Sequence, residues 1–196
     1  MNQRLLQQLD FLVEVDKLKS VYRRSYITDR SRHENDAEHT WHLTMMAILL
    51  LEHVDNQQLD ILRVLKMLIV HDLVEIDAGD TFAYDEQGHE DKYEREQAAA
   101  RRLFGMLPDD QREELMTLWE EFEARQSPEA QYAAALDRLQ PLIQNYRTEG
   151  VSWREHGVTS DKVLARNRHI GDISSELWAY VQSLVADSVN KGYLKP

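Results

Sequence analysis

Apolar residues recur at helical spacing along nearly the whole chain. Near the start, Leu5, Leu9, Leu12 and Val15 lie on one face at intervals of three or four residues, which is the period of an amphipathic helix. The same spacing predicts about seven helices, over residues 3–19, 37–53, 57–76, 90–105, 108–125, a sixth that begins at Ser127-Pro128, and 160–191. We find no sustained alternation typical of a strand, and only 7 Gly and 4 Pro interrupt the pattern. The pattern therefore predicts an all-α helical bundle.

Composition narrows the classes of function. The net charge of -12 disfavours duplex DNA and anionic membranes as partners, because both need a basic protein face. A small phosphorylated ligand stays possible, since a bound cation and a few arginines invert the local field. The absence of cysteine excludes disulfides, thiolate metal sites and cysteine nucleophiles. We find no signal peptide and no apolar run of membrane-spanning length, so we expect a cytoplasmic protein.

Four polar residues interrupt apolar helix faces in three separate segments. They are His39, the adjacent pair His71-Asp72, and Asp137. Burying an imidazole or a carboxylate is costly unless a partner satisfies it. Taken singly, each has an ordinary explanation: a hydrogen-bonded core histidine, a pair at a helix end, and a carboxylate paired with Arg138. Taken together, two imidazoles and two carboxylates form a ligand set suited to Mn, Fe, Co, Ni, Zn or Mg.

The order and surroundings of these residues resemble a known family. The segments Glu-Asn-Asp-Ala-Glu-His-Thr-Trp (34–41), His-Asp-Leu-Val-Glu-Ile-Asp-Ala-Gly-Asp (71–80) and Ala-Leu-Asp-Arg-Leu (135–139) are similar to motifs of the HD superfamily of metal-dependent phosphohydrolases. The branch that they resemble contains the bacterial 5'-deoxynucleotidases and related HD-domain proteins. The resemblance covers residues 18–137. It implies one HD domain over residues 1–196, with the metal-site core at 18–140 and the C-terminal helices of 141–196 packed on it.

The resemblance also assigns the candidate metal ligands and the catalytic carboxylates. His39, His71, Asp72 and Asp137 would bind one divalent metal ion, with Asp72 also counted as catalytic. Glu75 lies one helical turn beyond the ligand pair, where it would take a proton from, or orient, a water activated by the metal.

Substrate contacts are expected from two further segments. An arginine after the first helix would bind phosphate oxygens, and either Arg23 or Arg24 fits that position. Asp80 resembles the position that recognises the sugar in the deoxynucleotidases, with Thr81 beside it. The alternative for Asp80 is a turn aspartate. Some family members carry an aromatic residue directly after the arginine, where this chain has Ser25.

The expected activity is metal-dependent removal of phosphate from a nucleotide, with a (deoxy)nucleoside 5'-monophosphate as the first candidate substrate. The alternatives are nucleoside triphosphates, cyclic nucleotides or alarmones, and a non-catalytic HD-fold interaction module. Because relatives commonly form dimers, we expect a homodimer. The last predicted helix carries an apolar face that would either form such an interface or pack on its own core, comprising Leu177, Trp178, Val181, Leu184 and Val185.

Overall fold

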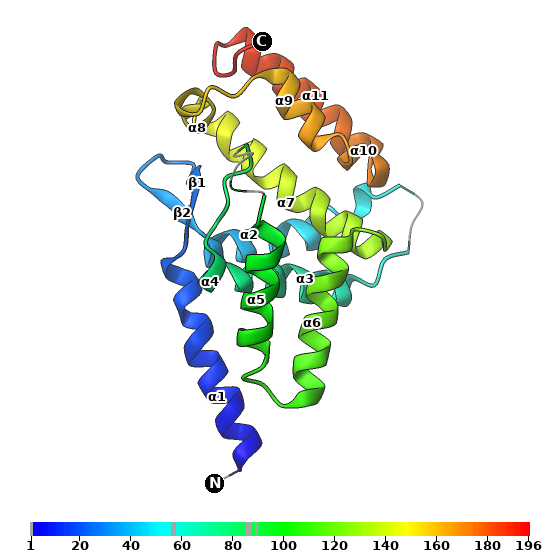
Figure 1. The fold of residues 1–196 in the computed structure, drawn as a ribbon. Helices are drawn as coiled ribbons and strands as arrows, with labels where there is room; N and C mark the ends of the chain where they lie inside the picture. Colours follow the sequence, from blue (N-terminus) through cyan, green and yellow to red (C-terminus); the bar gives the residue numbers. More distant parts are fainter. Residues whose placement is uncertain (1, 56–57, 85–87, 89) are drawn as a thin grey trace.

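The chain folds as a bundle of helices with one small hairpin near its N-terminus (Figure 1). The computed structural model describes residues 2–55, 58–84, 88 and 90–196. Within these residues the helices are, in order, α1 (Gln3–Val15), α2 (Asp36–Leu49), α3 (Ile61–Val70), α4 (Glu75–Ala78), α5 (Lys92–Phe104), α6 (Asp109–Ala124), α7 (Pro128–Arg147), α8 (Val151–Glu155), α9 (Ser160–Asn167), α10 (Ile170–Ile173) and α11 (Ser175–Asn190). The predicted all-α class is confirmed.

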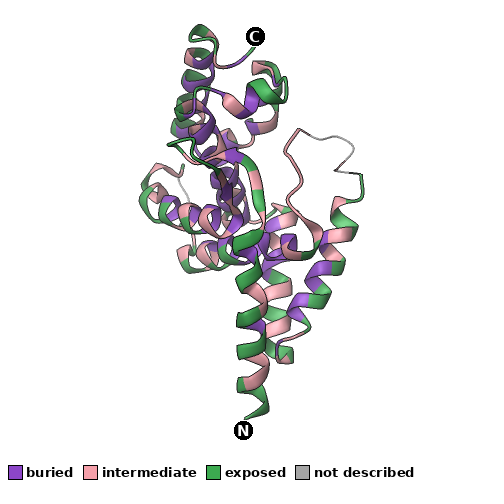
Figure 2. Cartoon of the chain, turned by 90° about the vertical axis from the view of Figure 1, so that its left-hand side faces the viewer, coloured by how far each residue is buried: buried purple, intermediate pink, exposed green. Residues whose placement is uncertain are grey.

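The long helix α7 lies at the centre of the bundle, and α2, α3 and α6 pack around it. Its side chains Tyr132, Leu136 and Leu139 are almost fully buried. On the other side α10 and α11 pack on α7, and Val181 and Val185 of α11 join this core. The apolar face of the last helix is therefore used within the chain. By contrast, α1 extends from the body and exposes much of its outer face (Figure 2).

The predicted third helix is divided into three parts. The bound at residue 57 lies outside the described residues, and α3 begins at Ile61, where Asp60 accepts a hydrogen bond from the amide of Arg63 as an N-cap. The α-helix then tightens into a 3₁₀ turn at His71–Val74 and resumes as α4. Gly79 ends α4 with φ of 75°, a conformation that glycine adopts without steric cost. The candidate ligand pair thus lies in the 3₁₀ turn.

The prediction of one helix over residues 160–191 is wrong. The segment forms α9, α10 and α11, because Ser174 adopts extended backbone and its hydroxyl accepts a hydrogen bond from the amide of Leu177, which begins a new helix. The short helix α8 was not predicted at all. The predicted second helix also ends earlier than residue 53, at Leu49, and a 3₁₀ turn follows it.

The hairpin was not predicted either. Strand β1 (Tyr22–Tyr26) pairs antiparallel with β2 (His33–Asn35), and the register is irregular between Tyr22 and Tyr26. Its residues are mostly polar, so the alternation of apolar and polar side chains that reveals a strand is absent. The hairpin places β1 against α7 and α8, beside the polar residues of the bundle.

The packing of the C-terminal segment yields a stability prediction. Gly150 has φ of 71°, and a Cβ atom there would collide with the backbone carbonyl of Tyr193. We expect Gly150→Ala to lower the free energy of unfolding by about 3 kcal/mol or more, from backbone strain and overpacking together. Gly157→Ala is the matched control, because φ there is 62° but no atom lies within 4 Å; it should cost about 1–2 kcal/mol. Equal losses in urea denaturation would contradict the described packing.

Candidate functional site

The structure brings the four candidate ligands together from three elements. His39 comes from α2, His71 and Asp72 from the 3₁₀ turn, and Asp137 from α7, and all four side chains are buried. One ligand atom from each of His39, His71 and Asp72 lies within 4.8 Å of the others. Asp137 Oδ1 is 3.1 Å from His39 Nε2 and 4.0 Å from His71 Nε2. The polar interruptions of separate helix faces therefore form one cluster.

The environment of His71 fits a bound cation. Its Nδ1 donates to the carbonyl oxygen of Leu68 at 2.8 Å, so Nδ1 carries a hydrogen. The buried Nε2 has no hydrogen-bond partner among the described residues, although Asp72 Oδ1 lies only 3.0 Å away. In the neutral imidazole, Nε2 then directs a lone pair at carboxylate oxygens. Such an arrangement is favourable only with a positive charge between the atoms, and the donor set suits a divalent metal ion.

His39 is oriented by a buried network that continues along α7. Its Nδ1 donates to Gln140 Oε1 at 3.1 Å. The amide groups of Gln140 and Gln144 in turn donate to Glu34 Oε1, at 2.8 and 2.7 Å. This chain of bonds fixes the ring so that Nε2 faces Asp137. Partners of this kind orient metal-binding histidines.

The pKa of His39 depends on the neighbouring carboxylates of Asp137 and Glu34. Burial and the nearby Arg23 guanidinium lower its pKa, but hydrogen bonds to Asp137 and Glu34 outweigh them and raise the pKa to about 9. Without a metal ion, a proton on His39 thus neutralises part of the buried negative charge. A cation and this proton would compete for the same position, as is general for metal-binding histidines.

A second acidic group lies beside the ligands. One carboxylate oxygen each from Asp36, Glu75 and Asp80 lies within 4.8 Å of the others. Burial raises the pKa of Asp36 to about 7, and the neighbouring charge of Asp72 adds to the rise. Burial likewise raises the pKa of Glu75 well above its usual range, and the hydrogen bond to Asp36 raises it further, so Glu75 keeps its proton as the donor. Burial and the neighbouring carboxylates therefore favour the protonated form of Glu75 when no cation is bound.

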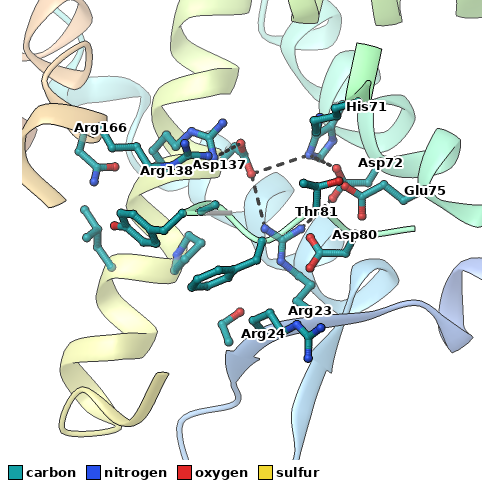
Figure 3. A pocket seen from close by; sticks show the side chains of 18 of the residues that line it. Arg23, Arg24, His71, Asp72, Glu75, Asp80, Thr81, Asp137, Arg138 and Arg166 are labelled. Atoms are coloured by element: carbon teal, nitrogen blue, oxygen red, sulfur yellow. Dashed lines mark hydrogen bonds and ion pairs between the residues drawn. The ribbon is translucent and has the colours of Figure 1, made fainter. Parts of the chain in front are cut away.

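The two candidate arginines point in different directions (Figure 3). The Arg23 guanidinium enters the acidic cluster, with Nη1 3.2 Å from Asp72 Oδ2 and 3.5 Å from Asp36 Oδ1. Arg24 follows it on strand β1 and is exposed, because successive side chains of a strand point to opposite faces. Burial lowers the pKa of Arg23, but Asp72 and Asp80 outweigh it and raise the pKa.

A cavity of about 390 Å³ is lined by Arg23, His71, Asp72, Glu75 and Asp137. All four predicted substrate contacts border it, namely Arg23, Arg24, Asp80 and Thr81 (Figure 3). Two aromatic side chains, Phe82 and Tyr84, also face it and meet in an edge-to-face pair with ring centroids 5.5 Å apart. Its size is typical of small-molecule sites.

Several residues of the site were not predicted. Asn35 provides the N-cap of α2, and the next residue, Asp36, joins the acidic group. Gln140 and Gln144 stand three and seven residues after Asp137, on the same helix face, and this spacing was the available signal. Trp153 also lines the cavity from α8, beyond the region of the predicted resemblance.

Comparison with known proteins gives a consistent result. A family model for the HD domain matches residues 15–178. The 5'-deoxynucleotidase HDDC2 of Danio rerio is 33% identical over 142 residues, covering 72% of this chain and 69% of the relative. The human protein of the same name is 32% identical over 137 residues, covering 69% of this chain and 65% of the relative. The match thus spans about two thirds of these relatives.

Among solved structures, one described as a predicted metal-dependent phosphohydrolase from Magnetospirillum magnetotacticum MS-1 is 53% identical. It superposes with a TM-score of 0.94 and covers 98% of this chain and 96% of that one. A hypothetical protein from Pyrococcus furiosus, 22% identical with a TM-score of 0.66, shares the fold.

The helical fold and the clustered His39, His71, Asp72 and Asp137 are typical of a helical domain with a metal site. The family model identifies that domain. The chain belongs to the HD domain family, and the predicted resemblance is confirmed. The match also extends past residue 137, where the predicted resemblance ended. None of the helices in the described residues combines the length and apolar character needed to cross a membrane. The cytoplasmic location stays a prediction.

The acidic group predicts how stability depends on pH. The native state keeps a proton on Asp36 up to about pH 7, whereas an unfolded chain releases it near pH 4. The metal-free protein should therefore lose stability as pH rises between these values, by roughly 1 kcal/mol per pH unit. We expect Asp36→Asn to flatten this slope in denaturation with EDTA at pH 5, 6 and 7. Asp161→Asn, on exposed α9, should keep the wild-type slope. Equal slopes for both variants would contradict the assignment.

Proposed function

We propose that this protein is a metal-dependent phosphohydrolase that removes phosphate from a nucleotide, with a (deoxy)nucleoside 5'-monophosphate as substrate. The observation that carries the proposal is the meeting of His39, His71, Asp72 and Asp137 with the protonatable Glu75 at one cavity. The relatives named 5'-deoxynucleotidase and the neighbour described as a metal-dependent phosphohydrolase support it.

The four candidate ligands would hold one divalent cation. When bound, this ion would polarise phosphate oxygens and increase the acidity of water. The two imidazoles and two carboxylates suit Mn, Fe, Co, Ni, Zn or Mg. Without the cation, Arg23 and the proton on His39 would neutralise the charge of the buried carboxylates.

The chain's own groups would then bind the phosphate and move the proton. Arg23 is the better candidate for phosphate, because its guanidinium already lies among the carboxylates and has donors in a fixed geometry. A bound cation would favour the ionised form of Glu75, because it offsets the neighbouring negative charge. The buried Oε2, which has no hydrogen-bond partner among the described residues, would then accept a proton from the attacking water. The water oxygen forms a bond to phosphorus, the bond from phosphorus to the 5' oxygen breaks, and the proton passes to that oxygen.

The rest of the cavity offers surfaces for a nucleoside. We place the sugar near Asp80 and Thr81, since both border the cavity next to the acidic group. Phe82 and Tyr84 provide an aromatic surface against which a base can pack. This surface takes the place of the aromatic residue that some relatives carry after the arginine, where this chain has the buried Ser25.

We also propose that the protein forms a homodimer through the outer faces of α2 and α3. These two helices pack against each other, and large exposed apolar side chains lie on both, including Trp41, Ile48, Leu62 and Ile69. Such side chains are typical of interfaces.

Ile48→Glu should convert the dimer to monomer in sedimentation velocity. Leu12→Glu, on exposed α1, should leave the dimer intact. A wild-type monomer would sink this proposal.

Two substitutions should separate metal binding from proton transfer. We expect Asp72→Ala to lose bound divalent metal and phosphate release together, because it removes a ligand. Glu75→Gln should keep the metal but lower kcat about 10²–10⁴-fold, as for loss of a general base. Metal content is measured by elemental analysis, and phosphate release by assay with deoxynucleoside 5'-monophosphates and each of several divalent ions.

His53→Ala is the control, since this histidine pairs with Glu176 on the outside of the bundle; it should keep both properties. Full phosphate release by metal-free Asp72→Ala protein would contradict the proposed function. A wild-type protein that binds no divalent metal would favour a non-catalytic HD module instead.

A further inference from the structure

The side of the cavity opposite the acidic residues carries positive charge. Three arginines from three elements line it: Arg125 at the C-terminal end of α6, Arg138 on α7 and Arg166 on α9. Arg138 and Arg166 lie on one side of Asp137, and His71, Asp72 and Glu75 lie on the other (Figure 3). In a chain with a net charge of -12, such a concentration of positive charge needs an explanation.

These arginines have too few carboxylate partners. Arg138 Nη1 lies 3.7 Å from Asp137 Oδ2, whereas no carboxylate among the described residues lies within ion-pair distance of Arg125 or Arg166. Arginines on the outer surface behave differently: Arg4 and Arg32 each bind a carboxylate with two hydrogen bonds. Structural ion pairs therefore account for Arg4 and Arg32 but not for Arg125 and Arg166.

The three side chains are also held close together against their own repulsion. Burial and the charge of Arg138 lower the pKa of Arg125. Burial and the charge of Arg138 likewise lower the pKa of Arg166 to about 10. The backbone of Arg125 has φ of 52°, an uncommon value for a residue other than glycine, and the Arg166 guanidinium lies over the ring of Tyr84 at 5.7 Å. A bound anion would relieve this repulsion.

We propose that Arg125, Arg138 and Arg166 bind a second phosphate group of the substrate, in addition to the phosphate that is removed. Guanidinium groups recognise phosphate oxygens through paired hydrogen bonds, and three of them suit a dianion. This assignment rests on the proposed function, because it takes the phosphate at the His71 side as the reacting one. The preferred substrate is then a nucleotide with two phosphate groups, and a (deoxy)nucleoside 5'-monophosphate would occupy only the side of the cavity next to His71.

Asp137 lies between the acidic side and the basic side of the cavity. Its Oδ1 faces His39 and His71, and its Oδ2 faces Arg138. The two phosphates would thus bind on opposite sides of one carboxylate, within the same cavity. Two arrangements supply such a pair: a diphosphate chain, or a single phosphate on the 5' position and another on the 3' position of the sugar.

Binding to the metal-loaded protein tests the subsite without requiring turnover. The first pair of probes is imidodiphosphate, which resists hydrolysis, against inorganic phosphate. The second pair is deoxyadenosine 3',5'-bisphosphate against deoxyadenosine 5'-monophosphate, both measured with the Glu75→Gln variant, which should hold the metal and turn over slowly. Within at least one pair, calorimetry should show that the ligand with the additional phosphate binds at least about tenfold more tightly. Arg125→Gln and Arg166→Gln should each reduce that preference roughly 10–100-fold, as expected for hydrogen bonds to charged groups.

Arg101→Gln, on exposed α5 and bonded to Gln97, is the control and should keep the preference. The pair that shows the preference identifies the source of the second phosphate. No preference in either pair, or an equal loss in the control, overturns the subsite. Phosphate release from nucleotides by the wild type is measured separately: its absence overturns the proposed function, while the binding result still decides the subsite.

Discussion

The arrangement of the site depends on negative charge that the bundle buries at the junction of α2, α7 and the 3₁₀ turn. Asp72 and Asp137 cannot lie so close together in a low-dielectric interior unless positive charge lies between them or beside them. In the metal-free protein this charge comes from Arg23 and from a proton on His39. A bound cation could displace both, so the cluster is a candidate binding site. An ion pair that no ligand could displace would not provide a binding site.

The sequence predicted the helical class, and it singled out the four candidate ligands that the fold brings together, because both leave strong local signals. Helical periodicity is repeated over many residues, and a histidine or carboxylate on an apolar face is conspicuous. The boundaries were less predictable. The helix expected over residues 160–191 breaks where Ser174 bonds a backbone amide, and this depends on a single serine within an otherwise helical pattern. The hairpin was missed because polar side chains cover both of its faces.

The basic side of the cavity could not be predicted for a different reason. Arg125, Arg138 and Arg166 come from three separate elements, and in the sequence only Arg138 has an evident partner, the adjacent Asp137. That the three arginines share one cavity, and that Arg125 and Arg166 have no ion-pair partner among the described residues, are properties of the assembled fold. Asp36 could not be recognised for a similar reason, because an aspartate at the start of a helix resembles a cap until the tertiary contacts are known.

The neighbouring positions of Asp137 and Arg138 on α7 have a consequence for how such enzymes diversify. Successive residues of an α-helix point about 100° apart, so one residue is directed toward the two histidines and the next toward the basic side of the cavity. Exchange of Arg138 would alter the preferred ligand while the adjacent ligand position kept its geometry. Because both residues lie on one rigid helix, the basic side of the cavity could change during evolution while the candidate metal ligands kept their positions.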